Sequence, residues 1–290
     1  MSSQEKNIEK VKNIFLFESG FFVLAQLLGI FSALRILELF ETEKFYSRPP
    51  SFWGFIFAVF LASFFIFFLI KFLKLGSRKK IFFKIIFVLT VFLGSFIFFS
   101  LWLGDFLALL FLFFLFFFWF KSANILLHNF LLIFALVGLG SVVGLGLEPK
   151  MIILALVIFS FYDFVAVYKT KHMVKMARAM IESEAILGLV LPSKVSGFKA
   201  NLKEIFSKGK FVVLGGGDIL FPLILCVSLL SQGTLSSLIV AFFVTIGLAV
   251  SFSIFIFQPF LGLGDKRQPI PALPPIAFFS IIGFLLTKLI

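Results

Sequence analysis

The chain alternates between long apolar runs and short polar connections. The runs are 15 to 25 residues long. A transmembrane helix needs roughly 20 mostly apolar residues, so each run is predicted to be a membrane span. The predicted spans are 14–38, 51–73, 82–103, 106–120, 124–147, 150–168, 211–231, 234–258 and 270–290. This pattern predicts an all-α membrane protein with nine transmembrane helices.

One long polar connection, 169–210, divides the spans into six and three. The N-terminal six-helix part is expected to cover 1–168, and the C-terminal three-helix part 211–290. Within the connection, 173–187 is expected to form a helix at the membrane surface, and 187–192 is a short apolar piece. We expect one membrane domain and no second, soluble domain.

Composition supports a membrane protein. The chain is 61% hydrophobic, has a mean hydropathy of +1.16 and contains 49 Phe. Only 14% of its residues are charged, against about a quarter in soluble domains. These values exclude a soluble enzyme, a disordered chain and a nucleic-acid-binding domain. The single cysteine, Cys226, excludes an intrachain disulfide and a Cys-rich metal site.

The net charge of +12 predicts an orientation. If nine spans alternate across the membrane, 21 of the 26 Lys and Arg residues fall on the side of the N-terminus and five on the other. Positive charge accumulates in cytoplasmic loops. We therefore expect a multi-pass protein of the cell membrane with a cytoplasmic N-terminus and an external C-terminus. The basic connection 169–210 is expected to lie at anionic lipid and to bind no nucleic acid.

Ionisable side chains inside spans are costly and are functional candidates by default. Asp163 and Asp218 are the strongest candidates. Glu18 and Arg35 lie near the ends of the first span and are expected to reach the membrane surface. His128 is expected to be a hydrogen-bonded packing residue.

The two aspartates are predicted to lie at similar depth. Asp163 precedes Lys169 by six residues, and Asp218 follows Lys210 by eight. At 1.5 Å per helical residue, these separations are roughly 9 and 12 Å from the same membrane face. Two adjacent carboxyl groups share a proton, as in aspartic proteases, where one activates a water and the other polarises the carbonyl. The structural alternative is a buried carboxyl that only hydrogen-bonds a neighbouring helix.

The surroundings of Asp218 and a proline cluster add detail. Three glycines, 215–217, allow close backbone approach, and Pro222 removes the helical hydrogen bond to the Asp218 carbonyl. Four prolines in 268–275 are not expected to begin a regular helix. They should leave backbone groups free near the level of the aspartates, where an extended substrate strand could pair.

Three short motifs then resemble a known family. Tyr162-Asp163, residues 215–218 and residues 271–273 resemble the YD, GxGD and PAL motifs of the presenilin and signal peptide peptidase family of intramembrane aspartyl proteases. The resemblance covers essentially the whole chain and is close to the compact microbial presenilin homologues. It implies a presenilin-like fold. A cytoplasmic N-terminus matches the presenilins, whereas the connection 169–210 is much shorter than the presenilin loop.

The resemblance also implies residue roles. Asp163 and Asp218 would be the catalytic pair. The residues expected to support them are Tyr162, Gly215, Gly216, Gly217 and Pro222. The residues expected to shape the substrate groove are Pro271, Ala272 and Leu273.

By this resemblance, the chain would be an intramembrane aspartic endopeptidase. It would cleave transmembrane helices of membrane proteins or remnant signal peptides. No cofactor or metal is expected, and the partners would be substrate helices and the lipid bilayer. Eukaryotic-type partner subunits are expected not to be required, and the oligomeric state stays open.

Other functions remain as alternatives. A proton-coupled transporter, or a cation channel or leak, could use the same aspartates. Such transporters are typically built from inverted repeats, which the six-plus-three layout does not show. A metalloprotease would need His-Glu-x-x-His, and the only histidines are His128 and His172. A serine protease using His128 has no Gly-x-Ser-Gly sequence within a span to support it.

Overall fold

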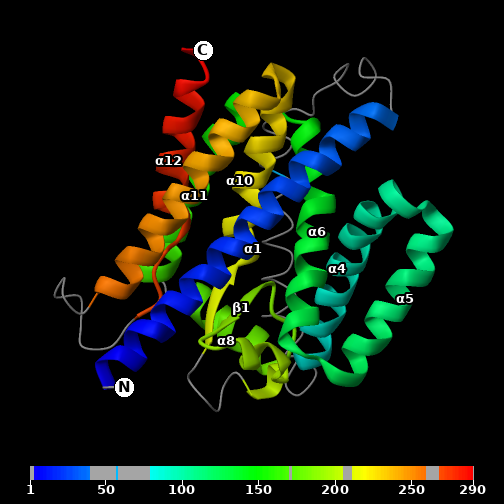
Figure 1. The fold of residues 1–290 in the computed structure, drawn as a ribbon, viewed down its shortest axis with the longest axis vertical. Coiled ribbons are helices and arrows are strands. Elements are labelled where there is room, and N and C mark those ends of the chain that lie inside the picture. The colour runs from blue at the N-terminus through cyan, green and yellow to red at the C-terminus, as the bar shows by residue number, and fades with distance from the viewer. Residues whose placement is uncertain are drawn as a thin grey trace.

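The structure is a bundle of helices with a small sheet at one end (Figure 1). It is a computed structural model that describes residues 3–39, 57, 79–169, 172–204, 211–258 and 268–289. Within these ranges the long helices are α1 (Ser3–Leu39), α4 (Lys79–Leu103), α5 (Asp105–Ser122), α6 (Ile125–Leu145), α7 (Pro149–Phe164), α10 (Gly216–Ser228), α11 (Thr234–Phe257) and α12 (Leu273–Leu286).

Most of the predicted spans have a helical counterpart. Among the described residues, six helices are long and apolar enough to cross a membrane. Two shorter apolar helices, Gly216–Gln232 and Leu273–Leu286, match the seventh and ninth predicted runs. The second predicted span, 51–73, lies almost wholly outside the described residues. The chain is therefore a multi-pass membrane protein whose described part accounts for eight of the nine predicted runs.

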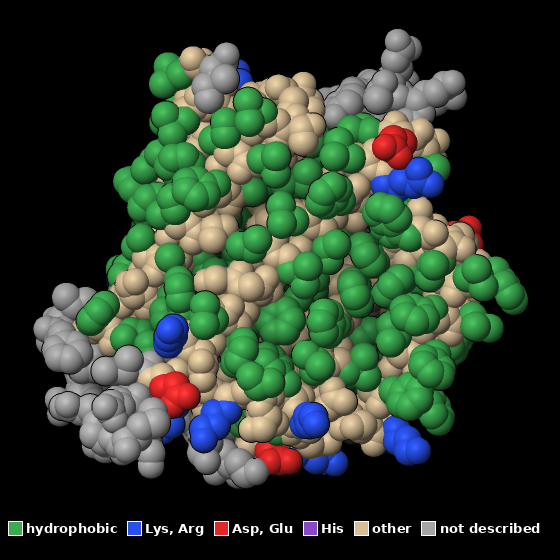
Figure 2. All heavy atoms as spheres, viewed as in Figure 1, with side chains coloured by type: hydrophobic (Ala, Val, Ile, Leu, Met, Phe, Trp, Pro, Cys, Tyr) green, Lys and Arg blue, Asp and Glu red, His purple; other side chains and the backbone are tan. Residues whose placement is uncertain are grey.

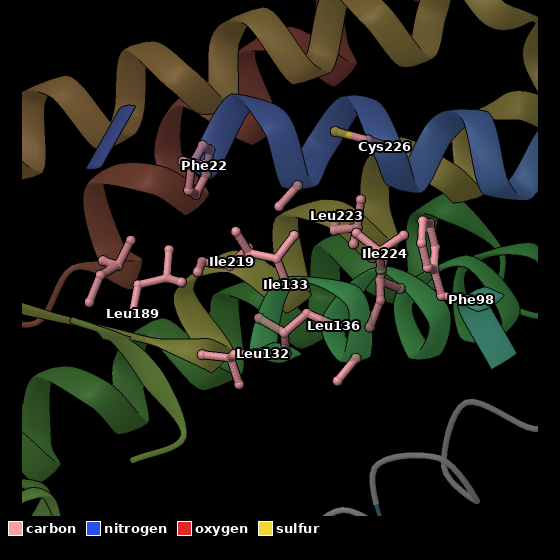
Figure 3. Packing of buried hydrophobic residues seen from close by; sticks show 14 of the residues in the cluster. Phe22, Phe98, Leu132, Ile133, Leu136, Leu189, Ile219, Leu223, Ile224 and Cys226 are labelled. Carbon is pink, nitrogen blue, oxygen red and sulfur yellow. The ribbon is translucent and has the colours of Figure 1, made fainter. Parts of the chain in front are cut away.

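Helix α10 is held tightly between α1 and α6. In Figure 3, its side chains Ile219, Leu223 and Ile224 fill the space between these two helices. Small residues allow the close approach: a Cβ added at Gly144 of α6 would lie 2.6 Å from Cβ of Val227. Glycine at helix contacts is a common way of packing helices in membranes. Helix α10, which carries Asp218 in its first turn, is thereby fixed between two long helices.

The region between α7 and α10 departs from the predicted helices. Helix α8 (His172–Glu182) ends before the predicted limit of 187 and is followed by strand β1 (Gly188–Pro192). Strand β2 (Phe211–Gly215) pairs with it in an antiparallel sheet. The prediction of a transmembrane helix beginning at 211 is therefore wrong for its first five residues. The run of Phe, Val and Leu there suits a strand as well as a helix, since apolarity alone does not separate the two.

Charge and apolar surface are separated along the molecule. Figure 2 shows hydrophobic side chains over most of the visible face, and most visible Lys and Arg side chains at the end that carries α8, β1 and the N-terminus. The exposed phenylalanines of α5 include Phe106 at 76% and Phe113 at 69%. Such exposure is typical of a lipid-facing helix.

Candidate active site

Asp163 lies on the inner side of α7, close to the helix end. It is only 7% exposed, whereas its neighbours Tyr162 and Phe164 are 47% and 49% exposed. A π-helix, η2 (Val165–Lys169), follows directly. Short π-helical segments are frequent at functional sites. The structure thus turns the Asp163 carboxyl inward and Tyr162 outward, so Tyr162 is not brought to the carboxyl through its side chain.

The PAL segment supplies a hydrogen-bond donor to Asp163. The backbone N–H of Leu273, the first residue of α12, donates to Oδ2 of Asp163 at 3.4 Å. Pro274 and Pro275 follow it and have no N–H groups of their own, which suits the first turn of a helix. The expectation that the prolines prevent a regular helix is therefore confirmed for Pro269 and Pro271, which precede α12, and wrong for Pro274 and Pro275, which lie in its first turn.

A side-chain amide holds the segment that leads into PAL. At the end of α11, the buried amide of Gln258 pairs with both backbone groups of Gln268. Its Nε2 donates to the Gln268 carbonyl at 3.0 Å, and its Oε1 accepts from the Gln268 N–H at 2.7 Å. This contact ties the start of 268–273 to α11. Pro271 and Leu273 are buried behind it, and Ala272 is half-buried.

Asp218 lies in the first turn of α10, immediately after β2. The backbone of Gly215 hydrogen-bonds its carboxyl group, and the carboxyl is within electrostatic range of Asp163 and Glu18. A Cβ added at Gly215 would lie 3.0 Å from Oδ2 of Asp218. The absence of a side chain at Gly215 therefore lets the carboxyl fold back against the end of β2.

The other motif positions differ in how tightly they are packed. The N–H of Gly216 donates to the Leu187 carbonyl at 2.9 Å, and a Cβ at Gly216 would lie 3.0 Å from that oxygen. Gly217 is exposed, and a Cβ there would make only ordinary contacts. Pro222 is buried within α10. Close backbone approach is therefore required at the middle glycine more than at the third.

Two buried polar residues of α1 lie close to Asp218. Glu18 is 5% exposed, so the prediction that it reaches the membrane surface is wrong. Gln26, 1% exposed, donates from Nε2 to the Ile219 carbonyl at 3.2 Å, beside Asp218. Gln26 was not predicted as a site residue. The available signal was spacing, because Glu18, Phe22 and Gln26 recur every four residues and so share one face of the helix.

Helix α6 contacts the sheet through two adjacent side chains. Asn129, fully buried, donates from Nδ2 to the Val190 carbonyl at 2.8 Å and accepts at Oδ1 from the Val190 N–H at 2.9 Å. Nε2 of His128 lies 3.4 Å from the Gly188 carbonyl, and its ring stacks on Phe87. The prediction that His128 is a hydrogen-bonded packing residue is confirmed. Asn129 was not predicted.

Among the described residues, no group of three or more His, Cys, Asp or Glu side chains could hold a metal ion. The centre of the candidate site is a pair of carboxyl groups, Asp163 on α7 and Asp218 on α10. It is framed by the N-terminus of α12, the end of β2 and the buried face of α1. Such a pair within a membrane bundle is the arrangement of an aspartyl protease that works inside the bilayer.

Comparisons with known proteins agree with this class. The family model for signal-peptide peptidase and presenilin aspartyl proteases matches residues 19–290, so the chain belongs to this family of intramembrane aspartyl proteases. A solved structure of a presenilin-family intramembrane aspartate protease in space group C222 is 20% identical, with a TM-score of 0.60 over 95% of this chain and 98% of that one. A second, in space group P2, is 22% identical, with a TM-score of 0.56 over 94% and 97%. No curated protein matches.

Proposed function

We propose that this protein hydrolyses peptide bonds within transmembrane helices of membrane proteins or remnant signal peptides, with Asp163 and Asp218 as the catalytic pair. The observation that carries the proposal is the convergence of these carboxyls from different helices inside an apolar bundle. Asp218 is within electrostatic range of Asp163, and Leu273 donates a hydrogen bond to Asp163. Intramembrane carboxyl groups are rare and mark functional sites.

The chemistry needs one carboxyl protonated and the other ionised. The ionised group takes a proton from a water, whose oxygen bonds to the substrate carbonyl carbon, while the protonated group gives its proton to the carbonyl oxygen. The tetrahedral intermediate then collapses: the C–N bond breaks and the leaving nitrogen receives a proton, which leaves a carboxyl and an amine. The pair titrates as a unit, so neither residue is assigned the acid role alone.

The sheet offers a place where an unwound substrate can pair. Both backbone groups of Val190 bond to Asn129, so they face away from β2. In an antiparallel pair, bonded and non-bonded positions alternate, and Val190 lies opposite Val213. The N–H and C=O of Val213 therefore point to the outer edge of β2, where no strand among the described residues pairs. A substrate strand added there would run past Gly215 toward Asp218.

We further propose nine spans with a cytoplasmic N-terminus and an external C-terminus. The six long apolar helices and two shorter ones support this count, with the remaining span assigned to 51–73. The basic end in Figure 2 supports the orientation, since it carries the N-terminus and α8. Cleavage would then occur in the cytoplasmic part of the substrate helix, because the sheet and both aspartates lie toward that end.

The test is a cleavage assay with purified protein and a single-pass peptide labelled at both ends. Asp163→Asn and Asp218→Asn should each abolish cleavage, because each removes one ionisable member of the pair. Asp105→Asn is the matched control, since Asp105 is exposed at the start of α5. A peptide analogue with a hydroxyl at the scissile carbon should inhibit the wild type. Full activity in either dyad variant would refute the proposal.

A further inference from the structure

The buried amide of Asn129 occupies the edge of β1 that faces away from β2. Its two hydrogen bonds to Val190, at 2.8 and 2.9 Å, reproduce the pair that a neighbouring strand would make. Asn129 is 0% exposed on α6, a helix packed against α1, α4 and α10. The Asn129 side chain, held on α6, therefore takes the hydrogen-bonding positions that a neighbouring strand would occupy beside Val190, at the edge of β1 opposite β2.

Because β1 and β2 are paired, the position of Val190 also determines the position of β2. Val190 lies opposite Val213, and Gly188 lies opposite Gly215. The two strands approach closely at Gly188, because a Cβ there would lie 2.6 Å from the Leu214 carbonyl oxygen. Gly215 in turn hydrogen-bonds the Asp218 carboxyl. One chain of contacts thus links the Asn129 amide to the catalytic candidate.

We propose that Asn129 is a positioning residue that determines where the substrate is cut. By holding β1 against α6, it fixes the position of the paired strand β2, which leads directly into Asp218, and it leaves β2 as the edge to which a substrate strand can add. This proposal rests on the proposed proteolytic function. An amide that merely anchored β1 would affect stability alone, whereas a register-setting amide also determines which peptide bond reaches the aspartates.

The experiment compares variants that remove the two hydrogen bonds separately and together. Asn129→Leu removes both, and Asn129→Asp with an ionised carboxylate keeps only the acceptor for the Val190 N–H. Asn124→Ala is the control on the same helix, because Asn124 caps α6 by accepting from Leu127 at 2.8 Å and does not bond the sheet. The substrate is a synthetic single-pass peptide with about 20 apolar residues and a Gly-rich break near its cytoplasmic end.

Two readouts are needed, product lengths by mass spectrometry and amide hydrogen exchange of 188–192. Asn129→Leu should add new product lengths, raise KM more than it lowers kcat, and speed exchange of the Val190 amide about tenfold, the factor that corresponds to roughly 1.4 kcal/mol. Asn129→Asp should shift the products less, and Asn124→Ala should keep the wild-type set of products.

An unchanged product set and KM in folded Asn129→Leu would overturn the inference. If that variant does not fold, Asn129→Asp decides in the same way, because it is isosteric with asparagine. Failure of the proposed function would look different: the wild type would cleave no peptide, or Asp218→Asn would cleave as well as the wild type. Hydrogen exchange would still test the sheet in that case, and unchanged protection of Val190 in Asn129→Leu would overturn the positioning role.

Discussion

Glu18 is a buried carboxyl whose removal should stabilise the fold. It is 5% exposed on α1, and its Oε2 has no hydrogen-bond partner among the described residues. A buried polar group left without a partner costs about 1–3 kcal/mol, and leucine fills a similar volume without that cost. Glu18→Leu should therefore raise the free energy of unfolding by about 1–3 kcal/mol, which corresponds to about 2–4 °C of melting temperature per kcal/mol.

The assay is thermal unfolding of the purified protein in one detergent, run beside peptide cleavage. Glu18→Gln keeps a polar atom in the same place and should gain little. Glu9→Leu is the control on the same helix, because Glu9 is exposed. Since the Glu18 carboxyl is within electrostatic range of Asp218, Glu18→Leu should also cleave more slowly than the wild type. A lower melting temperature in Glu18→Leu than in Glu18→Gln would refute the reasoning.

Three further outcomes are expected. Gly188→Ala places a Cβ 2.6 Å from the Leu214 carbonyl oxygen, so it should force the two strands apart. The free energy of unfolding should fall by about 1–3 kcal/mol, measured by thermal melting, and the rate of peptide cleavage should fall with it. Gly144→Val should push α10 away from α6 at Val227 and lower the melting temperature more than Gly20→Val, where a Cβ meets no atom within 4 Å. The rate of peptide cleavage should fall at both acidic and alkaline pH, because the reaction needs one carboxyl of each protonation state; a flat profile would contradict the shared-proton mechanism.

The transmembrane helices could be predicted because the bilayer imposes a length that sequence reports directly. Eight predicted runs contain apolar helices in the described residues. The strands were missed for the same reason, since Phe211–Gly215 adjoins the apolar run of α10 and extends it without a polar break. Its β-branched pair Val212-Val213 and the glycines that follow were the only local signals for a strand and its end.

Residues whose role depends on a partner helix could not be found by inspecting their own segment. Glu18 lies nine residues beyond Glu9 on the same helix, yet one carboxyl is buried and the other exposed. The position of Asn129 in the sequence does not indicate a special role, because a single asparagine in a span often only hydrogen-bonds a neighbouring helix. Its partner, Val190, is 61 residues away in a strand that was not predicted. Tertiary contacts of this kind carry no local pattern.

Strand β2 also changes the depth expected for Asp218. A helix from Lys210 to Asp218 would rise about 12 Å, whereas the five strand residues Phe211–Gly215 alone span about 16 Å at roughly 3.3 Å each. Counting helical residues from the connection 169–210 therefore does not predict the depth of Asp218 relative to Asp163. The end of β2 instead holds the Asp218 carboxyl, the start of α12 holds that of Asp163, and the two lie within electrostatic range of each other. In the mechanism we propose, β2 also has a role in substrate binding. It ends beside Asp218 and offers an unwound substrate a free backbone edge for pairing, which a helix in the same place would not offer.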